Sequence, residues 1–339
     1  MSQINFYTID LAKNVFELHG YPEHGKRLLR RRLNRSRLAG FFERDAQPGA
    51  TVVMESCGSA HYWGRWLQAR DFKPVLLPPK HVRAFVRGNK TDTADAHALA
   101  LAWRVGDLHP VPIKSQTQQI IQLQHRMRDR QMAERIRVTN QIRAMLREFG
   151  VAVAQGDAAL KRATLAHLEA DASVPVTLQS MLSELYEEWR RLQDAIARSD
   201  RELERLYRAS EPCRRLGEIP GIGVITATAL IASIPDIHRF KRGRSLAAWL
   251  GLTPAEHSSG DKRNLGGITK RGNTHLRTLL IHGARSAVNQ AHRYSDATSR
   301  WIVQLEARRG RNVAVVALAN KNARIVWALL AHDAQYQPS

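Results

Sequence analysis

The sequence predicts an N-terminal α/β domain, a long helical arm and a mostly helical C-terminal domain. Short β-rich runs alternate with helical runs at the start of the chain, and long helical runs without glycine or proline follow them. The 339 residues are enough for two or three domains with their own cores. We therefore place the domains at residues 1–112, 113–210 and 211–335.

The first domain is expected to hold a mixed sheet with helices on its faces. Three β-rich runs come first, INFYTID, VFELHGY and KRLLRRRL. A helix near SRLAGFFERDA, the strand TVVMES, a helix near HYWGRWLQARD and the strand PVLLPP follow. The segment DTADAHALALAWRV predicts a helix with Asp92 near its start. Trp63, Trp66 and Trp103 lie in these helices beside Ala and Leu, so we expect them to pack in the core.

The arm is predicted from two polar and apolar helical runs between about Ser115 and Leu206. Paired long helices, as an antiparallel arm or a coiled coil, account for these runs better than a globular core does. A less regular stretch from Val151 to Val176 is expected to hold the turn between the two helices. The third region begins at Gly217 and ends in helices such as VAVVALANKNARIVWALLAH.

The charge of the chain points to a polyanionic partner. Lys and Arg number 52 against 31 Asp and Glu, which gives a formal net charge of +21. A hydrophobic fraction of 43% is typical of a folded protein, so this charge belongs to folded domains and not to a disordered tail. Within the basic excess, the run from Lys26 to Arg37 is either a solvated face or one wall of a nucleic-acid channel.

The sequence contains no apolar run approaching the roughly 18 residues that span a bilayer, and its N-terminus lacks a signal core. We therefore expect a cytoplasmic protein with no membrane partner. Only Cys57 and Cys213 occur, too few for a disulfide framework or a cysteine-based zinc site. Chemistry must come from oxygen ligands, hydroxyl groups or histidines.

Four carboxylates are candidates for a metal site. Asp10 and Glu55 each end a predicted strand, and Asp92 and Asp95 share one face at the start of a predicted helix. Oxygen-only ligands suit Mg²⁺ or Mn²⁺, and two-metal phosphoryl transfer is the chemistry that such a site supports. Taken singly, each has an ordinary structural interpretation, since a strand-end Asp is usually a turn residue and Asp92 alone fits a helix N-cap.

A glycine-rich turn opens the third region. Pro220 to Gly223, followed by VITATALIASI, is typical of a helix-hairpin-helix unit, in which Gly221 and Gly223 let backbone N–H groups approach a phosphate. The alternative is a simple glycine turn beside a packed helix, and the sequence does not decide between the two.

The segment from His257 to Arg271 is dense in small, hydroxyl and basic residues. Ser258 or Ser259, followed by Gly260, presents a hydroxyl group, and four cations surround it: Lys262, Arg263, Lys270 and Arg271. In an average protein a Ser-Ser-Gly-Asp run is only a loop. The histidines at 257, 275 and 282 follow no metal-ligand spacing and are interpreted as structural or phosphate-contacting.

These motifs together resemble the DEDD transposases of bacterial insertion sequences, family 110 and especially its subgroup 1111, which are described as bridge-RNA-guided recombinases. The resemblance covers most of the chain. It rests on IDLAKNVF, MESCGSAHYWGR and NKTDTADAHALA, and then on IPGIG, LAAWLGLTP, SSG and GITKRGNTHLRTLLIHGA, in this order.

The resemblance implies a RuvC-like domain with the RNase H fold, in which Asp10, Glu55, Asp92 and Asp95 are the metal ligands. It implies that Ser259 attacks a DNA phosphate and forms a phosphoserine link, although Ser258 adjoins it. It also implies a DNA partner, a non-coding bridge RNA and a composite site shared between subunits of a dimer or tetramer. We add Lys90, from the third motif, to the residues expected to bind nucleic acid.

Two other functions remain open at this point. A Holliday-junction nuclease would need only the acidic cluster and a metal-activated water, and would have no use for the basic serine segment. A non-enzymatic nucleic-acid-binding protein would explain the charge, the glycine turn and the arm, but not the carboxylates.

Overall fold

The computed structural model describes residues 3–86, 91–106, 108–169, 175–260 and 262–337. The chain forms two compact units, Met1–Gln116 and Thr117–Ser339, called unit 1 and unit 2 below. The division into three domains that we drew from the sequence is finer than this one and stays a prediction.

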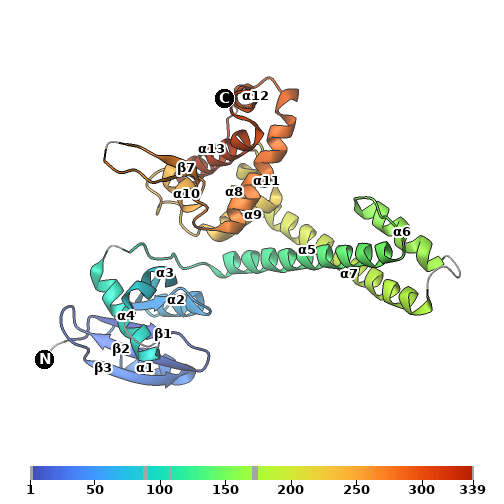
Figure 1. The fold of residues 1–339 in the computed structure, drawn as a ribbon. Coiled ribbons are helices and arrows are strands. Elements are labelled where there is room, and N and C mark those ends of the chain that lie inside the picture. The colour runs from blue at the N-terminus through green and yellow to red at the C-terminus, as the bar shows by residue number, and fades with distance from the viewer. Residues whose placement is uncertain (1–2, 87–90, 107, 170–174, 261, 338–339) are drawn as a thin grey trace. The chain divides into compact units, whose positions relative to one another are not determined.

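Unit 1 is built on a five-stranded sheet with the strand order β3-β2-β1-β4-β5 (Figure 1). The strands are β1 (Phe6–Asp10), β2 (Val15–Tyr21), β3 (Leu29–Asn34), β4 (Thr51–Glu55) and β5 (Lys73–Leu77). The first three pair antiparallel, whereas β4 runs parallel to β1 and β5 parallel to β4. The predicted mixed sheet is confirmed, and it is consistent with the RNase H-like domain that the resemblance implied.

Helices cover both faces of this sheet, because the central strands bury residues on both sides: one side is apolar, and the other mixes apolar residues with polar ones such as Thr8 and Glu17. The helical elements are α1 (Arg35–Arg44), α2 (Ala60–Gln68), α3 (Pro79–Val82), η1 (Arg83–Phe85) and α4 (Asp92–Val105). On one face Ile9 and Met54 pack with α1 and α2, and Trp63 there is 1% exposed. On the other face Val53 packs with Leu99 of α4. Trp66 and Trp103 are half-buried against these two clusters, so the predicted core packing of the tryptophans is confirmed.

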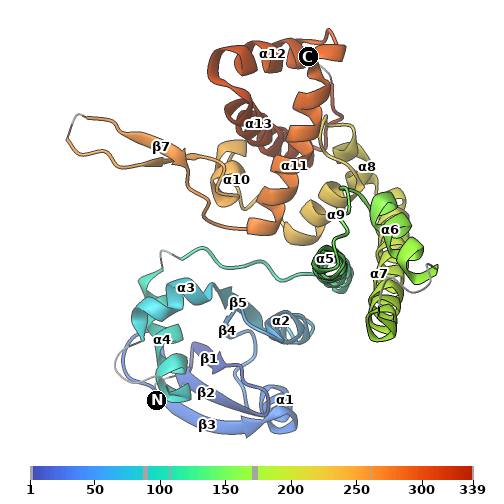
Figure 2. The same ribbon diagram turned by 45° about the vertical axis from the view of Figure 1, so that its right-hand side comes forward.

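The arm in unit 2 consists of α5 (Gln116–Glu148), α6 (Asp157–Glu169) and α7 (Val176–Ala209) (Figure 2). Arg128 near the start of α5 pairs with Asp200 near the end of α7 at 2.5 Å. Ile142 near the end of α5 packs with Leu182 near the start of α7, so the two helices run antiparallel. The expected irregular turn is wrong in part, because its middle forms α6, whose Leu160 is fully buried in the same cluster. The coiled coil stays a prediction.

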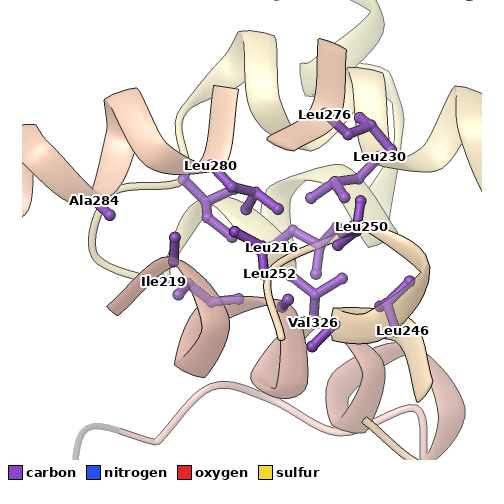
Figure 3. Packing of buried hydrophobic residues seen from close by; sticks show 14 of the residues in the cluster. Leu216, Ile219, Leu230, Leu246, Leu250, Leu252, Leu276, Leu280, Ala284 and Val326 are labelled. Atoms are coloured by element: carbon purple, nitrogen blue, oxygen red, sulfur yellow. The ribbon is translucent and has the colours of Figure 1, made fainter. Parts of the chain in front are cut away.

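The rest of unit 2 is a helical domain that carries one small β-hairpin. Its elements are α8 (Glu211–Gly217), α9 (Val224–Ser233), α10 (Gly243–Trp249), β6 (Pro254–Glu256), β7 (Leu265–Ile268), α11 (Thr274–Gln290), η2 (Ala291–Arg293), α12 (Ala297–Arg309) and α13 (Arg311–Ala331). Leu and Ile side chains from α8, α9, α10 and α11 meet those of α13 in one core (Figure 3). We did not expect β6 and β7, which lie in a segment that we interpreted as a loop.

The helix α13 corrects one expectation from the sequence. By length and composition, its 21 residues are apolar enough to cross a membrane. Its Leu318, Ala319 and Val326 are fully buried in the core of unit 2, which explains the apolar composition of a packed helix. One such helix is weak evidence for a membrane span, and the cytoplasmic location stays a prediction.

Candidate active site

Asp10 and Glu55 lie side by side at the carboxyl ends of β1 and β4. The register pairs Ile9 with Met54, so the next residue of each parallel strand is one of these two carboxylates. The negative charges of Glu55 and Asp10 also act on the Cys57 thiol, whose pKa is raised by burial first and by these charges second. The strand ends therefore bring the two carboxylates around one point.

Both carboxylates lie on the sheet face that α4 covers. Thr8 is two residues before Asp10 and so points to the same face. Its hydroxyl group donates a hydrogen bond of 2.8 Å to the carbonyl oxygen of Ala96 in the first turns of α4. Val53, two residues before Glu55, packs against Leu99 of the same helix. We call this side of the sheet, with the start of α4, the acidic face.

Asp92 and Asp95 lie in the first turn of α4, as the sequence predicted. Thr91 caps the helix by accepting a hydrogen bond of 3.2 Å from the backbone N–H of Ala94. Carboxylates at this end of a helix are favoured by the helix dipole. Asp92 is exposed and lies 3.9 Å from Arg32 of β3, whereas Asp95 is half-buried next to Ala96.

The four carboxylates fit a hard divalent cation by chemistry, since all are oxygen donors. Among the described residues, however, no three His, Cys, Asp or Glu side chains form a group that could hold a metal ion. The structure therefore places two pairs of carboxylates on one face of unit 1 without bringing three of them together.

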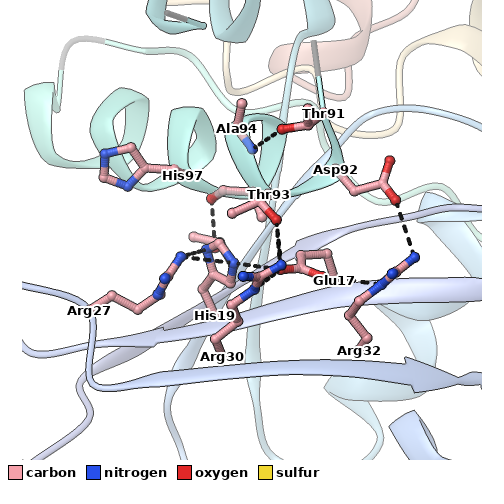
Figure 4. Close-up of polar contacts among 12 residues, drawn as sticks. Glu17, His19, Arg27, Arg30, Arg32, Thr91, Asp92, Thr93, Ala94 and His97 are labelled. Atoms are coloured by element: carbon pink, nitrogen blue, oxygen red, sulfur yellow. Dashed lines mark hydrogen bonds and ion pairs between the residues drawn. The ribbon is translucent and has the colours of Figure 1, made fainter. Parts of the chain in front are cut away.

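The acidic face holds a polar cluster that we did not predict, centred on Glu17 of β2 (Figure 4). Glu17 is 2% exposed, and its Oε1 accepts hydrogen bonds from Arg30 Nε at 2.6 Å and from Thr93 Oγ1 at 3.1 Å. His19 Nε2 lies 3.0 Å from the same oxygen. Burial raises the pKa of Glu17, but the hydrogen bonds from Arg30, His19 and Thr93 outweigh it and leave the pKa below its ordinary value. An acidic residue in the middle of a strand was the available signal, and we overlooked it.

The basic run from Lys26 to Arg37 includes β3, and three of its arginines form ion pairs within unit 1. Arg30 pairs with Glu17, Arg31 with Asp45 at 3.3 Å, and Arg32 with Glu17 and Asp92 at 3.8 and 3.9 Å. These arginines remain half-exposed or more, so they are not sequestered in the core.

The second candidate region is the β-hairpin of residues 254–268, which we call the serine hairpin. The hydroxyl group of Ser258 donates a hydrogen bond of 2.8 Å to Glu256 and accepts one of 3.2 Å from the backbone N–H of Asn264. Ser259 is exposed, and no described residue forms a hydrogen bond with its hydroxyl group. Its backbone pairs with Lys262 across the turn, and Gly260 has a φ of +56° there. Among the described residues, the hairpin therefore holds the hydroxyl group of Ser258 and leaves that of Ser259 without a partner.

The serine hairpin is anchored at its root by backbone contacts and one arginine. A Cβ atom on Gly272, whose φ is +84°, would lie 1.8 Å from the carbonyl oxygen of Trp249. The guanidinium of Arg277 is buried and donates hydrogen bonds of 3.1 Å to the carbonyl oxygens of Leu250 and Arg271. Sequence reasoning missed Arg277, because nothing distinguishes one arginine among many before the fold is known.

A groove of about 1120 Å³ runs beside the serine hairpin, between β7 and α13. Its lining includes Gly266, Gly267 and Ile268 of β7 and Val316 of α13. The described residues that line it include three cations and no acidic side chain: Arg309, Lys321 and Arg324. The groove combines an apolar floor with positive charge.

The remaining predicted residues are placed as follows. Lys262, Arg263, Lys270 and Arg271 are exposed on or next to the serine hairpin, and Arg263 pairs with Glu256 at 3.4 Å. Lys90 lies outside the described residues. His275 Nδ1 lies 3.0 Å from Asp129, which favours the structural interpretation of this histidine.

The two glycines of the turn differ: Gly221 fits the structural interpretation, whereas Gly223 leaves room for a ligand. Gly221 has a φ of +88°, and a Cβ atom there would lie 2.6 Å from the carbonyl oxygen of Gly283 in α11, so this glycine serves close packing. Gly223 precedes α9, and a Cβ atom on it would have no neighbour within 4 Å. The helix-hairpin-helix function of the turn stays a prediction.

Comparisons with known proteins identify the chain. A DEDD model described as "Transposase" matches residues 8–151, and a model described as "Transposase IS116/IS110/IS902 family" matches residues 213–299. A probable family 20 transposase of Pseudomonas aeruginosa is 43% identical over 97% of this chain and 98% of its own length.

Two further relatives match along nearly their whole length. The transposase for insertion sequence element IS1111A of Coxiella burnetii is 40% identical, over 99% of this chain and 92% of the relative. The transposase for IS1328 of Yersinia enterocolitica is 36% identical, over 97% of each chain. A mixed-sheet domain with paired carboxylates, joined to a helical transposase region, defines a DNA-processing enzyme of the transposase class. The chain belongs to the IS116/IS110/IS902 family of insertion-sequence transposases.

Proposed function

We propose that this transposase cuts and exchanges DNA strands with Ser259 as the nucleophile and with a divalent cation held by Asp10, Glu55, Asp92 and Asp95. The single observation that carries the serine assignment is the contrast within the Ser258–Ser259 pair. Ser258 already uses its hydroxyl group with Glu256 and Asn264, whereas the hydroxyl group of Ser259 is exposed and is held by no described residue.

In the proposed step, Ser259 Oγ forms a bond to a DNA phosphorus, and the bond from that phosphorus to one bridging oxygen of the DNA breaks. The leaving strand departs as a hydroxyl group, and the other DNA end stays linked to the serine. A hydroxyl group of a second strand then attacks the same phosphorus and releases the serine. The exposed cations Lys262, Lys270 and Arg271 support this step, because they neutralise phosphate charge near the reacting bond.

A bound Mg²⁺ or Mn²⁺ would polarise the phosphate and stabilise its developing charge. Within the protein, Asp10 and Glu55 are fixed by their strands, and Asp95 is fixed by the first turn of α4. Asp92 would exchange its 3.9 Å contact with Arg32 for the cation. Such a contact between exposed groups is weak, so the exchange costs little.

The proposed nucleic-acid path includes the groove beside the serine hairpin. Arg309, Lys321 and Arg324 line it, and no acidic residue does so in the part of the chain that the structure describes, which suits a polyanion. We further propose that a bridge RNA supplies sequence recognition and that the acidic face and the serine hairpin act together between subunits of an oligomer, as the resemblance implied. If base pairing with the RNA reads the DNA sequence, the protein needs to contact only the nucleic-acid backbones.

A denaturing gel tests the proposal directly. The protein is mixed with labelled DNA from the junction and target of its own element, with the non-coding RNA of the element and Mg²⁺. We expect a protein-linked DNA band for the wild type and for Ser258→Ala, and none for Ser259→Ala or Asp10→Ala. Cleavage without a linked band would instead favour a nuclease that uses only the acidic face.

A further inference from the structure

We propose that Glu17 is a positioning residue for the acidic face, because it fixes the first turn of α4 relative to the strands that carry Asp10 and Glu55. This inference rests on the proposed function for the metal, but its central claim concerns the geometry of unit 1. Glu17 is the neighbour of Asp10 across the two strands but is not itself one of the proposed ligands.

Glu17 occupies the same row of the sheet as the proposed ligands. The register pairs Asp10 with Glu17 across β1 and β2, and Glu17 with Arg32 across β2 and β3. Glu55 continues the row beyond Asp10. Residues paired in this way point to one face, so the side chain of Glu17 lies under α4.

The contacts of Glu17 reach α4 between the two aspartates. Thr93 stands between Asp92 and Asp95 in sequence, and its hydroxyl group donates to Glu17 Oε1 at 3.1 Å. Arg30 completes a triangle, with Nε on Glu17 Oε1 at 2.6 Å and Nη2 on Thr93 Oγ1 at 2.8 Å. A helix turn held at its second residue cannot rotate or slide without breaking these bonds, so its aspartates keep their direction.

A second contact runs through the other oxygen of the carboxylate. Arg32 lies 3.8 Å from Glu17 Oε2 and 3.9 Å from Asp92 Oδ2, so in the metal-free protein it bridges the strand and the helix (Figure 4). Oε2 has no hydrogen-bond partner among the described residues although it is buried. A buried charge with an unsatisfied oxygen adds little net stability. The presence of Glu17 at this buried position is therefore better explained by its orientation of the first turn of α4.

Residues around a metal site commonly orient the ligands without binding the metal themselves. Outer groups that orient the ligands typically change metal affinity by 10- to 100-fold when they are removed. Glu17→Gln removes the charge that attracts Arg30 and Arg32, and Thr93→Val removes the link to α4 while it keeps that charge.

The experiment measures Mn²⁺ affinity by calorimetry in the full chain and amide hydrogen exchange of the α4 first turn in the metal-free protein. We expect Glu17→Gln and Thr93→Val each to weaken Mn²⁺ binding by about tenfold and to speed exchange at the start of α4. Thr93→Ser, which keeps the hydroxyl group, should behave as the wild type.

Glu43→Gln is the matched control, since it removes the same charge from an arginine pair elsewhere in unit 1, at 3.0 Å from Arg70. It should leave both measurements unchanged. Wild-type affinity and exchange in Glu17→Gln would overturn the inference. Weaker binding in Glu17→Gln with wild-type binding and exchange in Thr93→Val would also overturn it, because the effect would then be one of charge and not of position. Absence of Mn²⁺ binding in the wild type would refute the proposed metal site, and exchange alone would then decide the role of Glu17.

Discussion

The acidic face and the serine hairpin are built in different ways. Asp10 and Glu55 end strands whose neighbours are buried on both faces, and a network of hydrogen bonds joins the facing helix to the sheet. The described residues of the serine hairpin from Glu256 to Gly267 are exposed, and the contacts that anchor the hairpin lie at its root. Groups on sheet strands are placed by folding itself, whereas groups at a hairpin tip are placed only within the freedom of the hairpin. If Ser259 is the nucleophile that we propose, the substrate or a partner therefore has to complete its position.

The largest effect is expected at the root of the serine hairpin. Gly272→Ala should destabilise unit 2 by about 4 kcal/mol, from backbone strain at a positive φ and from the clash with the carbonyl oxygen of Trp249. Urea unfolding measures this loss. Gly260→Ala at the tip is the control, because its Cβ atom would have no neighbour within 4 Å, and it should cost only about 1 kcal/mol. Equal losses would show that the root is no more rigid than the tip.

Acidification should act next, and on both units. Burial and neighbouring cations lower the pKa of His61 in unit 1 and of His125 in unit 2 to about 4. Between about pH 4 and the ordinary histidine pKa of 6.5, the unfolded chain binds protons that the folded chain does not. Stability should therefore fall as the pH is lowered from 7 to 5.

Urea unfolding at the two pH values measures this change. The substitutions His61→Asn and His125→Asn should each flatten the pH dependence of the unit that holds the histidine. If both variants kept the wild-type slope, other groups would be responsible for it.

A smaller effect is expected where α4 meets the sheet. Thr8→Val should destabilise unit 1 by about 1 kcal/mol, because it removes the hydrogen bond to Ala96. Thr164→Val is the control, since Thr164 is equally buried but bonds only within its own helix, to Leu160. Chemical unfolding compares the two variants. A loss in the control as large as that in Thr8→Val would contradict a special role for the α4 contact.

The smallest effect is expected in the groove beside the serine hairpin. Arg309→Gln should lower the slope of log affinity against log salt for DNA by about 1, since it removes one phosphate contact. Arg308→Gln changes the neighbouring residue, which does not line the groove, and should keep the wild-type slope. Fluorescence anisotropy at several salt concentrations distinguishes them. An equal change in both variants would indicate a diffuse positive surface.

The sheet of unit 1 was largely predictable because hydrophobic alternation marks each strand on its own. The sequence INFYTID became β1, and TVVMES became β4. The positions of the carboxylates at the strand ends could be predicted from strand geometry, which needs only local sequence. The polar cluster around Glu17 could not be predicted, because Glu17 contacts Thr93 across 76 residues of chain.

The serine hairpin was predictable in composition but not in shape. Its glycines and hydroxyl groups are typical of a loop, and only two short strands form there. The hydrogen bond that occupies the Ser258 hydroxyl group depends on Glu256, whose direction is set by the hairpin pairing. Likewise α6 was missed because its helix is stabilised by packing on the arm more than by its own periodicity.

A ribosome releases β1, β2 and β3 first, and each of these strands can pair at once with the one before it. Glu55 reaches Asp10 only when β4 crosses over to the free edge of β1, and Asp92 arrives still later with α4. Ser259 leaves the ribosome after the whole arm has been made. A nascent chain thus never presents the nucleophile before the carboxylates have been made, and the chemistry that we propose for this enzyme becomes available only after the whole arm has been synthesised.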